Sequence, residues 1–352
     1  MTNLLVTGGA GFIGANFVHY WARKHPNDVI VVLDALTYAG NRASLKGLDS
    51  IEFVHGDIRN TDLIDTLLRE WAITTIVHFA AESHVDRSID SPDAFIETNV
   101  IGTHSLLKAA KANWIDNGTG HPHRFHHIST DEVYGSLGPT DPAFDETTAY
   151  APNSPYSASK AGSDHLVRAY HHTYGLDVTT TNCSNNYGPF QFPEKLIPLF
   201  LLNALHGRPL PIYGDGMNVR DWLHVEDHCL GIEAAILHGK PGETYNIGGG
   251  QELPNVAVID EIIRTVDAAF AADPALGIKF PDAPAAQGSS TEVLKTFVKD
   301  RLGHDRRYAI DETKARNELG YAPSRTFAEG FASTLAWYLN NESWWRPLLG
   351  RR

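Results

Sequence analysis

A glycine-rich turn near the N-terminus constrains the fold more than any other feature of the chain. The run TGGAGFIG, residues 7–14, lies between a short apolar strand at residues 4–6 and an expected helix at residues 12–24. It satisfies both G-x-G-x-x-G and G-x-x-G-x-x-G. Glycines there permit a tight turn and let backbone N–H groups approach a pyrophosphate at the helix N-terminus. The residues that we expect to contact a dinucleotide here are Gly8, Gly11, Phe12, Ile13 and Gly14.

Hydrophobic runs alternate with helical patterns through the first half of the chain. We expect strands at residues 4–6, 29–33, 51–54, 75–79, 125–129 and 177–181, and helices at residues 12–24, 62–71, 94–112 and 156–174. Strands that are hydrophobic throughout indicate a parallel sheet with both faces covered by helices. The sequence therefore predicts an α/β fold with a Rossmann-type doubly wound parallel sheet.

The pattern changes after Asn182, where prolines and turn residues become frequent. We interpret this part as a smaller α/β substrate-binding domain, and expect a helix at residues 225–237 to return to the first domain. The expected division is 1–187 with 219–240 for the Rossmann domain, and 188–218 with 241–352 for the second domain. Residues 271–290 are rich in Ala, Pro, Gly and Ser and are expected to form a loop or mobile insertion.

Composition excludes several classes of protein. With 352 residues the chain is long enough for about two domains, and none of its apolar runs is as long as a membrane span. The formal charge of −13 disfavours general nucleic-acid binding but not a nucleotide ligand, since a few arginines suffice at contact range. Cys183 and Cys229 are too few for a disulfide framework and fit a reducing compartment. The first residues lead straight into a strand, so we expect no leader segment and a cytoplasmic protein.

Acidic residues follow the second and third expected strands. Asp34 ends the second strand, close to the spacing expected for the carboxylate that binds the adenosine ribose. That charge should repel a 2′-phosphate, so NAD is favoured over NADP. Asp57 and Ile58 follow the third strand and are expected to flank the adenine.

Tyr156 and Lys160 are four residues apart and therefore share one face of the expected helix. A phenol, with a pKa of about 10, is a poor base at neutral pH. A nearby ammonium group and the charge of an oxidised nicotinamide would lower that pKa. Tyr-x-x-x-Lys is common by chance, but here it follows a dinucleotide turn and a strand that ends in Ser129-Thr130. The spacing therefore indicates a base for an alcohol.

Asp131 and Glu132 form an acidic pair at the carboxyl end of the strand expected at residues 125–129. Open α/β sheets place their ligand crevice at this end of the strands. Two carboxyl groups in one pocket can hold different protonation states, so one can donate a proton while the other removes one. A hydride acceptor, an alcohol base and a separate acid–base pair suit an enzyme that oxidises, eliminates water and reduces again.

Several stretches resemble the extended short-chain dehydrogenase/reductase superfamily and, within it, the dTDP-glucose 4,6-dehydratases. They lie between residues 7 and 311 and include TGGAGFIG, LDALTYAGN, HGDIRN, STDEVYG, YSASKA, NCSNNYGP and YGDGMNVRDWLHVEDH. The related 4-epimerases share the glycine turn and Tyr-x-x-x-Lys but generally lack the Asp-Glu pair.

The resemblance implies a hydro-lyase that converts dTDP-glucose to dTDP-4-keto-6-deoxyglucose with tightly bound NAD. Tyr156 would take the C4 hydroxyl proton while hydride passes to NAD, and Thr130 would hydrogen-bond the same hydroxyl. Glu132 would remove the C5 proton, and Asp131 would protonate the departing C6 hydroxyl. Hydride would then return to C6. The resemblance also implies a homodimer that pairs the helices expected at residues 94–112 and 156–174.

The same resemblance extends the binding site. It adds Thr37, Ala80, Ala81 and Asn99 to the cofactor contacts, together with Tyr156 and Lys160. The implied substrate contacts are Glu82, Ser83, His84, Thr130, Asn185, Asn186, Lys195, Tyr213, Arg220, Asn255, Arg301 and His304. Arg220 and Arg301 would hold the diphosphate, which a guanidinium binds in bidentate geometry. One departure is Leu302, where relatives usually carry Pro.

Three alternatives stay open. The chain could be a nucleotide-sugar 4-epimerase or a decarboxylase of the same superfamily, or a non-catalytic NAD-binding scaffold. His121, His123, His126 and His127 resemble a metal cluster, but adjacent strand residues point to opposite faces, and we expect no metal. Trp344 and Trp345 are expected to serve packing or an interface.

Overall fold

The computed structural model describes residues 2–118, 122–300 and 304–349. Seven parallel strands form the main sheet in the order β10-β6-β5-β4-β1-β2-β3. They are β1 (Asn3–Thr7), β2 (Val29–Asp34), β3 (Ile51–His55), β4 (Thr75–His78), β5 (Arg124–Thr130), β6 (Val178–Cys183) and β10 (Thr244–Ile247). The strand order reverses between β1 and β4, which is where doubly wound sheets bind their ligands. The predicted Rossmann-type α/β fold is confirmed.

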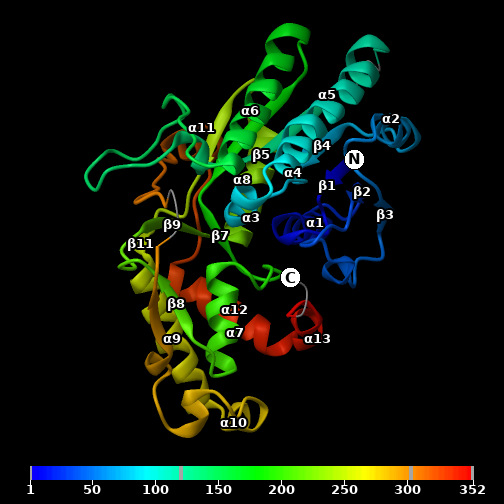
Figure 1. The fold of residues 1–352 in the computed structure, drawn as a ribbon. Helices are drawn as coiled ribbons and strands as arrows, with labels where there is room; N and C mark the ends of the chain where they lie inside the picture. The colour runs from blue at the N-terminus through cyan, green and yellow to red at the C-terminus, as the bar shows by residue number, and fades with distance from the viewer. Residues whose placement is uncertain (1, 119–121, 301–303, 350–352) are drawn as a thin grey trace.

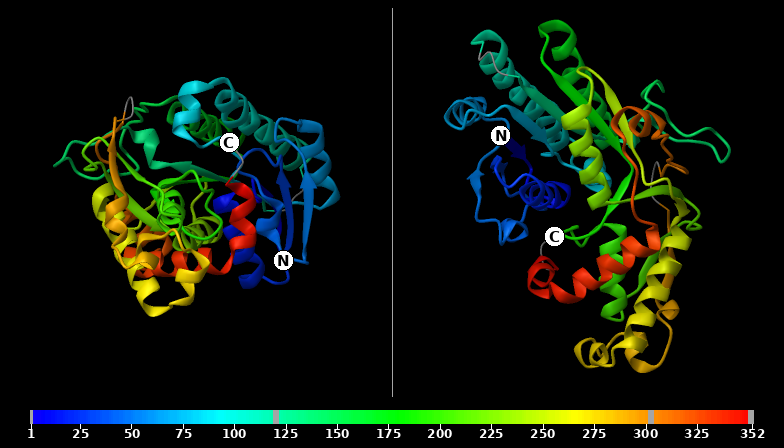
Figure 2. Two further views of the ribbon diagram at one scale, coloured as in Figure 1. Left: turned by 60° about the horizontal axis from the view of Figure 1, so that its bottom comes forward. Right: turned by 180° about the vertical axis from the view of Figure 1, so that it is seen from behind.

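Helices cover both faces of this sheet because its strands bury both sets of side chains. Leu5 faces the cluster under α2, α5 and α6, while its neighbours Leu4 and Val6 face the cluster under α1 and α8. The helices are α1 (Phe12–Lys24), α2 (Thr61–Glu70), α5 (Thr103–Lys111), α6 (Pro155–Tyr174) and α8 (Val225–His238). A short α3 (Val85–Asp90) precedes a nearly continuous helix of α4 (Asp93–Phe95), η2 (Ile96–Gly102), α5 and η3 (Ala112–Asp116). Figure 2 shows α8 on the face opposite α5 and α6.

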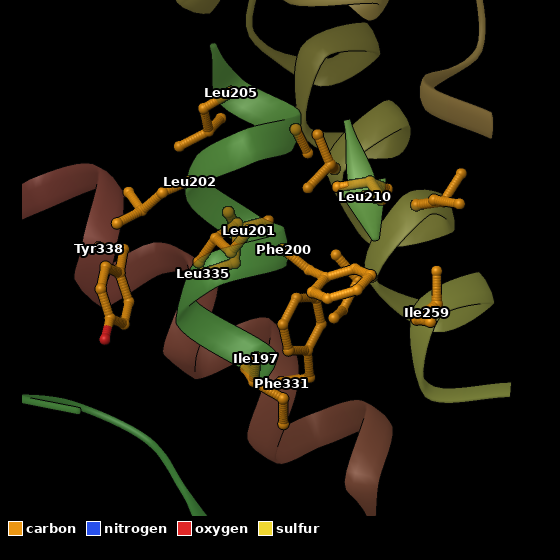
Figure 3. Packing of buried hydrophobic residues seen from close by; sticks show 14 of the residues in the cluster. Ile197, Phe200, Leu201, Leu202, Leu205, Leu210, Ile259, Phe331, Leu335 and Tyr338 are labelled. Atoms are coloured by element: carbon orange, nitrogen blue, oxygen red, sulfur yellow. The ribbon is translucent and has the colours of Figure 1, made fainter. Parts of the chain in front are cut away.

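The second lobe lies below the sheet in Figure 1 and has its own hydrophobic core. Its strands are β7 (Asn185–Tyr187), β8 (Leu210–Tyr213), β9 (Val219–His224), β11 (Glu252–Pro254) and β12 (Lys295–Val298), and its longer helices are α7 (Leu196–Leu205), α9 (Asn255–Ala272) and α12 (Phe327–Asn340). Figure 3 shows Phe200 and Leu201 of α7 among Ile259 of α9 and Phe331 and Leu335 of α12. The remaining short elements are η1 (Arg42–Leu45), η4 (Asp131–Tyr134), α10 (Ala275–Lys279), η5 (Pro284–Gln287), η6 (Thr291–Leu294), α11 (Thr313–Leu319), α13 (Glu342–Trp345) and η7 (Arg346–Leu348).

Two expectations about the second half of the chain need correction. β10 pairs with β6, so the first sheet extends beyond residue 240, where we had ended the first domain. β7 and β9, which we had placed in the first domain, form a separate sheet with β11. Residues 271–290 are not a loop or mobile insertion, because they contain the end of α9, then α10 and η5. Leu276, Phe280 and Ala283 of this segment are buried in the second core. Leu276 lies on α10, whereas Phe280 and Ala283 lie in the connection from α10 to η5, so the buried residues of this segment follow no single helical period.

The C-terminal helix α13 returns to the first lobe (Figure 2). Trp344 donates a hydrogen bond from its ring nitrogen to Ser44 Oγ at 3.0 Å, and Trp345 is fully buried. The expected packing role of this tryptophan pair is confirmed. Within the described ranges, no helix combines the length and apolar character needed to span a membrane.

Candidate active site

The glycine turn is packed so tightly that its first and last glycines admit no side chain. Gly8 has φ +70°, and a Cβ there would lie 2.6 Å from the backbone nitrogen of Ala80. A Cβ on Gly14 would lie 2.3 Å from the carbonyl oxygen of Gly8. Gly11 is the N-cap residue of α1 and has no side chain that could accept hydrogen bonds from the N–H groups of the first turn. These N–H groups can therefore bind other partners. A bare helix N-terminus approached by backbone alone fits the pyrophosphate of a dinucleotide.

Asp34 lines the same cavity as the glycine turn. Its carboxylate accepts hydrogen bonds from the backbone N–H of Ala10 at 2.9 Å and of Leu36 at 2.8 Å. Burial raises the pKa of Asp34, and the two N–H donors oppose that shift. The carboxylate therefore joins the glycine turn to the loop after β2.

One cavity contains nearly all of the expected cofactor contacts. The predicted residues that line it are Gly8, Gly11, Phe12, Ile13, Gly14, Asp34, Thr37, Asp57, Ile58, Ala80, Ala81, Tyr156 and Lys160. Asn99 does not line the cavity. Its buried amide accepts from the backbone N–H of Glu82 at 2.9 Å and donates to the Glu82 carbonyl at 3.0 Å and to Ser159 Oγ at 2.8 Å. Asn99 thus supports the cavity wall from behind.

Tyr156 and Lys160 enter this cavity from the first turns of α6. A capping box between Ser154 and Ser157, with a proline in the first turn, starts the helix at this point. Lys160 Nζ donates to the carbonyl of Ile128 at 2.7 Å, which ties α6 to β5. The ring of Tyr156 packs edge-on against Phe95, with 6.2 Å between ring centroids.

The pKa of Tyr156 moves in the direction opposite to the one expected from the sequence. Burial raises this pKa well above its ordinary value, and the neighbouring acidic groups, Glu132 first, add to the increase. A hydrogen bond with Thr130 lowers it. The residues of the chain therefore keep the phenol protonated, so a phenolate here needs a further positive charge in the cavity. An oxidised nicotinamide carries such a charge.

Asp131 and Glu132 form η4, directly after β5. Thr130 caps this turn: its hydroxyl accepts from the Glu132 N–H at 3.3 Å and lies 3.2 Å from Asp131 Oδ1, to which it donates. Asp131 is 2% exposed, and its Oδ2 makes no hydrogen bond to any residue in the described part of the chain. Burial first, then the charges of Glu132 and Asp221, raise the pKa of Asp131 well above its ordinary value. Asp131 is therefore suited to donate a proton, beside a second carboxyl group that lines the same cavity.

The expected substrate residues fall into two groups. Glu82, Ser83, Thr130, Asn185, Asn186 and Lys195 line the cavity. His84, Tyr213, Arg220, Asn255 and His304 are absent from its lining, and Arg301, like Leu302, lies outside the described residues. Lys195 Nζ donates to the carbonyl of Ser83 at 3.0 Å and so connects the two lobes across the cavity.

Arg220 lies behind the acidic pair rather than in the cavity wall. Its guanidinium donates to the carbonyls of Val219 at 2.7 Å and Asp305 at 2.9 Å, and stacks over Tyr308 at 4.3 Å. Its positive charge lowers the pKa of Asp131, against the larger effect of burial.

Three of the other outlying residues, Tyr213, Asn255 and His304, lie in the second lobe, and His84 precedes α3 of the first lobe. The Tyr213 ring lies 6.4 Å from that of His304, which is paired with Asp300 at 2.6 Å. Asn255 begins α9 and receives no side-chain hydrogen bond at Oδ1 from the described residues. His84 Nε2 lies 3.8 Å from Glu194 Oε2, close to the rim of the cavity.

Sequence reasoning missed several residues of the cavity wall. They include Tyr38, Thr98, Gln191, Phe192 and Glu194. The guanidinium of Arg87 stacks on the Tyr38 ring at 3.8 Å and lies 3.4 Å from Glu194 Oε2. Glu194 could have been found as the neighbour of Lys195, but no spacing pattern marks an aromatic residue in a loop.

The histidines of β5 make structural contacts with the neighbouring strand β6 and with α6. His126 Nδ1 lies 2.8 Å from Thr179 Oγ1, and His127 Nε2 lies 3.0 Å from Asp164 Oδ1. Among the residues that the structure describes, no three His, Cys, Asp or Glu side chains are grouped as metal ligands. His121 lies outside the described residues.

Known proteins match this chain over nearly its full length. A family model described as GDP-mannose 4,6 dehydratase matches residues 5–334. A dTDP-glucose 4,6-dehydratase of Xanthomonas campestris is 52% identical, with 99% of this chain and 96% of that protein covered. The corresponding protein of Neisseria meningitidis serogroup B is 50% identical, with 99% of this chain and 96% of that protein covered.

Solved structures agree with these matches. DesIV, a dTDP-glucose 4,6-dehydratase from Streptomyces venezuelae solved with NAD and TYD bound, has a TM-score of 0.87 and 48% identity, with 99% of this chain and all of that chain covered. A UDP-glucose 4-epimerase from Thermotoga maritima has a TM-score of 0.82 but only 26% identity, with 97% of this chain and all of that chain covered. The chain therefore belongs to the dTDP-glucose 4,6-dehydratases, within the extended short-chain dehydrogenase/reductase superfamily.

Proposed function

We propose that the chain is an NAD-dependent hydro-lyase that converts dTDP-glucose to dTDP-4-keto-6-deoxyglucose. The observation that carries this proposal is the buried carboxyl of Asp131 beside Glu132, in the cavity that also contains Tyr156 and the glycine turn. An epimerase needs a base and a hydride acceptor, but it eliminates no water and has no use for a separate acid–base pair. The identity of about 50% to dehydratases, against 26% to an epimerase, supports the same choice.

The first step is oxidation at C4 of the sugar. Bound NAD supplies the acceptor for the C4 hydride, the donor that returns hydride to C6 and, while oxidised, a positive charge. Tyr156 as phenolate removes the C4 hydroxyl proton. Thr130 hydrogen-bonds Tyr156 and holds the reacting hydroxyl in line with it. Lys160 keeps an ammonium group against the end of β5.

Elimination follows at C5 and C6. The 4-keto group acidifies the C5 proton, which Glu132 removes. Asp131 donates its proton to the C6 hydroxyl, which leaves as water. After hydride has returned to C6, Glu132 gives its proton back to C5. Tyr156 has then gained one proton and Asp131 has lost one, so a proton transfer between them, through solvent, closes the cycle.

Substrate binding uses both lobes. We assign the sugar to Glu82, Ser83 and Thr130 on the sheet side, and the nucleotide diphosphate to the second-lobe side around Asn186 and Lys195. Lys195 presents an ammonium group in the cavity wall. This assignment keeps the reacting carbons at the ends of β4 and β5.

A single-turnover experiment tests the proposal. Glu132→Gln should still transfer the C4 hydride from dTDP-glucose, so that NADH absorbance accumulates while little 4-keto-6-deoxy product forms. Glu292→Gln, an exposed carboxylate of the second lobe, is the matched control and should dehydrate like the parent. Dehydration by Glu132→Gln at the parent rate would remove Glu132 as the C5 base. Inversion at C4 by the parent enzyme without loss of water would favour the epimerase reading. A panel of dTDP-, UDP-, CDP- and GDP-hexoses tests the nucleotide.

We also propose a cytoplasmic homodimer. Ile89 of α3 and Ile96 and Ile101 of η2 are 44–48% exposed, and both elements contact α6, so apolar side chains are exposed next to that helix. Both cysteines are buried free thiols, as suits a reducing compartment. Light scattering at micromolar concentration should give twice the chain mass, and cell fractionation tests the compartment.

A further inference from the structure

Asp164 continues the catalytic face of α6 but has no part in the mechanism so far. It follows Lys160 by four residues, as Lys160 follows Tyr156, so the three side chains share one face of the helix. The Asp164 side chain is only 5% exposed. A carboxylate is costly to bury unless it is hydrogen-bonded and its charge is balanced. Its neighbours should therefore show what it does.

Three side chains surround the carboxylate of Asp164. His127 Nε2 lies 3.0 Å from Oδ1, while Ser129 Oγ and Tyr150 Oη donate to Oδ2 at 2.7 and 3.1 Å. Burial, helped by the charge of Lys160, lowers the pKa of His127 to about 4, so the ring is neutral at pH 7 and donates through Nε2. The hydrogen bonds of Asp164 are satisfied, but none of these three groups carries a balancing positive charge.

Lys160, one turn before Asp164 on the same face of α6, supplies a positive charge near this carboxylate. It is 4% exposed. Burial lowers the pKa of Lys160, and the negative charge of Asp164 is the largest effect that raises it again. Each residue therefore removes part of the cost of burying the other.

Among the described residues, no other group near this pair carries a charge that could balance Lys160 or Asp164. Five other titratable groups interact electrostatically with Lys160 or Asp164. They are His78 on β4, His127 on β5, Tyr134 on η4, Tyr150 in the loop before α6, and Cys183 at the end of β6. Burial lowers the pKa values of the two histidines and raises those of the two tyrosines and the cysteine, so all five are neutral at pH 7. Within the described residues, Asp164 is thus the carboxylate that balances Lys160.

The same contacts fix the end of β5. Lys160 holds the carbonyl of Ile128, and Asp164 holds the side chains of His127 and Ser129. Three consecutive strand residues are thereby tied to α6. The next residue, Thr130, must meet Tyr156 on that helix.

We propose that Asp164 is a positioning residue for the reaction, whose charge keeps Lys160 as an ammonium ion and whose carboxylate holds the end of β5 against α6. This inference rests on the proposed function for the role of Lys160 beside Tyr156. It concerns the oxidation step alone, which a dehydratase and an epimerase share. If the dehydration test fails, the proposed role of Asp164 can still hold. If the test of Asp164 fails, the proposed dehydration is unaffected.

The test is the pH dependence of the first hydride transfer in the NAD-loaded, full-length enzyme. Asp164→Asn keeps the shape and removes the charge, so Lys160 should lose its proton at lower pH. The alkaline limb of NADH formation from dTDP-glucose should move down by roughly one unit or more, as expected for the loss of a neighbouring opposite charge. Asp164→Glu should return the limb toward its parental position.

Ser129→Ala and Tyr150→Phe are the matched controls, since each removes one hydrogen bond and leaves the charge. They should lower the rate by a similar factor at every pH and leave the alkaline limb in place. An unchanged limb in Asp164→Asn, or an equal shift in the controls, would overturn the proposal.

A second measurement covers the case in which Asp164→Asn alone folds poorly. Lys160→Met leaves Asp164 buried without a cation, so adding Asp164→Asn to it should raise the urea midpoint above that of Lys160→Met. If the double variant is no more stable than Lys160→Met, the two charges are not coupled and the proposal fails.

Discussion

Replacement of Asp131 by Asn removes the proposed acid. It should also make the protein more stable than the parent by an amount that grows as the pH rises. Asp131 is 2% exposed, and burial raises its pKa well above the ordinary value of 3.8. The native state therefore binds this proton more tightly than the unfolded chain does. The stabilisation from that proton is complete below pH 3.8 and is lost as the pH rises toward the raised pKa.

The size of the effect follows from proton linkage. Each pKa unit of difference between folded and unfolded states corresponds to about 1.4 kcal/mol. An asparagine has no proton to lose. The free energy of unfolding of Asp131→Asn, relative to the parent, should therefore rise by about 1.4 kcal/mol per pH unit above the ordinary carboxyl range. This difference in the free energy of unfolding stops rising at the pKa of Asp131 in the folded protein. The pH at which the plateau begins therefore gives that pKa.

The assay is urea unfolding at saturating NAD, followed by tryptophan fluorescence at pH 5, 6, 7 and 8. Asp49→Asn, an exposed carboxylate in the loop before β3, is the control, and its difference from the parent should be nearly independent of pH. Asp131→Asn should also dehydrate roughly a hundred to ten thousand times more slowly than the parent. Parallel stability profiles of parent and Asp131→Asn would mean that Asp131 is ionised at neutral pH, and its role as the acid would fail.

Three further substitutions test the other parts of the site. Tyr156→Phe should slow NADH formation by roughly a hundred to ten thousand times with an unchanged melting temperature, and a near-normal single-turnover rate would remove Tyr156 as the base. Gly14→Ala places a methyl group 2.3 Å from the Gly8 carbonyl and should abolish NAD retention on gel filtration, whereas Gly277→Ala, with 3.7 Å to its nearest neighbour, should retain NAD like the parent. Asp34→Ala should weaken NAD binding and relax the discrimination against NADP, and an unchanged cofactor preference would assign that selection to another residue.

Local sequence patterns determine the parts of this protein that depend on near neighbours. The glycine turn needs only a strand before it and a helix after it, so residues 7–14 predict it directly. Tyr156 and Lys160 meet because a helix repeats every 3.6 residues. Asp131 and Glu132 could be placed at the ligand edge because they follow a hydrophobic strand of a parallel sheet. Each of these predictions uses a spacing of a few residues.

Tertiary structure alone decides which groups are buried together. The return of β10 to the first sheet depends on packing against β6, about 65 residues earlier in the chain, and no local pattern encodes that partner. The contacts of Asp164 with Tyr150, His127 and Ser129 join segments 14 to 37 residues apart. The raised pKa of Asp131 and the lowered pKa of Lys160 follow from the loss of water, which both lobes and the sheet produce together. Sequence therefore identifies the reacting groups, while packing of distant segments sets their charges, because desolvation depends on everything that surrounds a side chain.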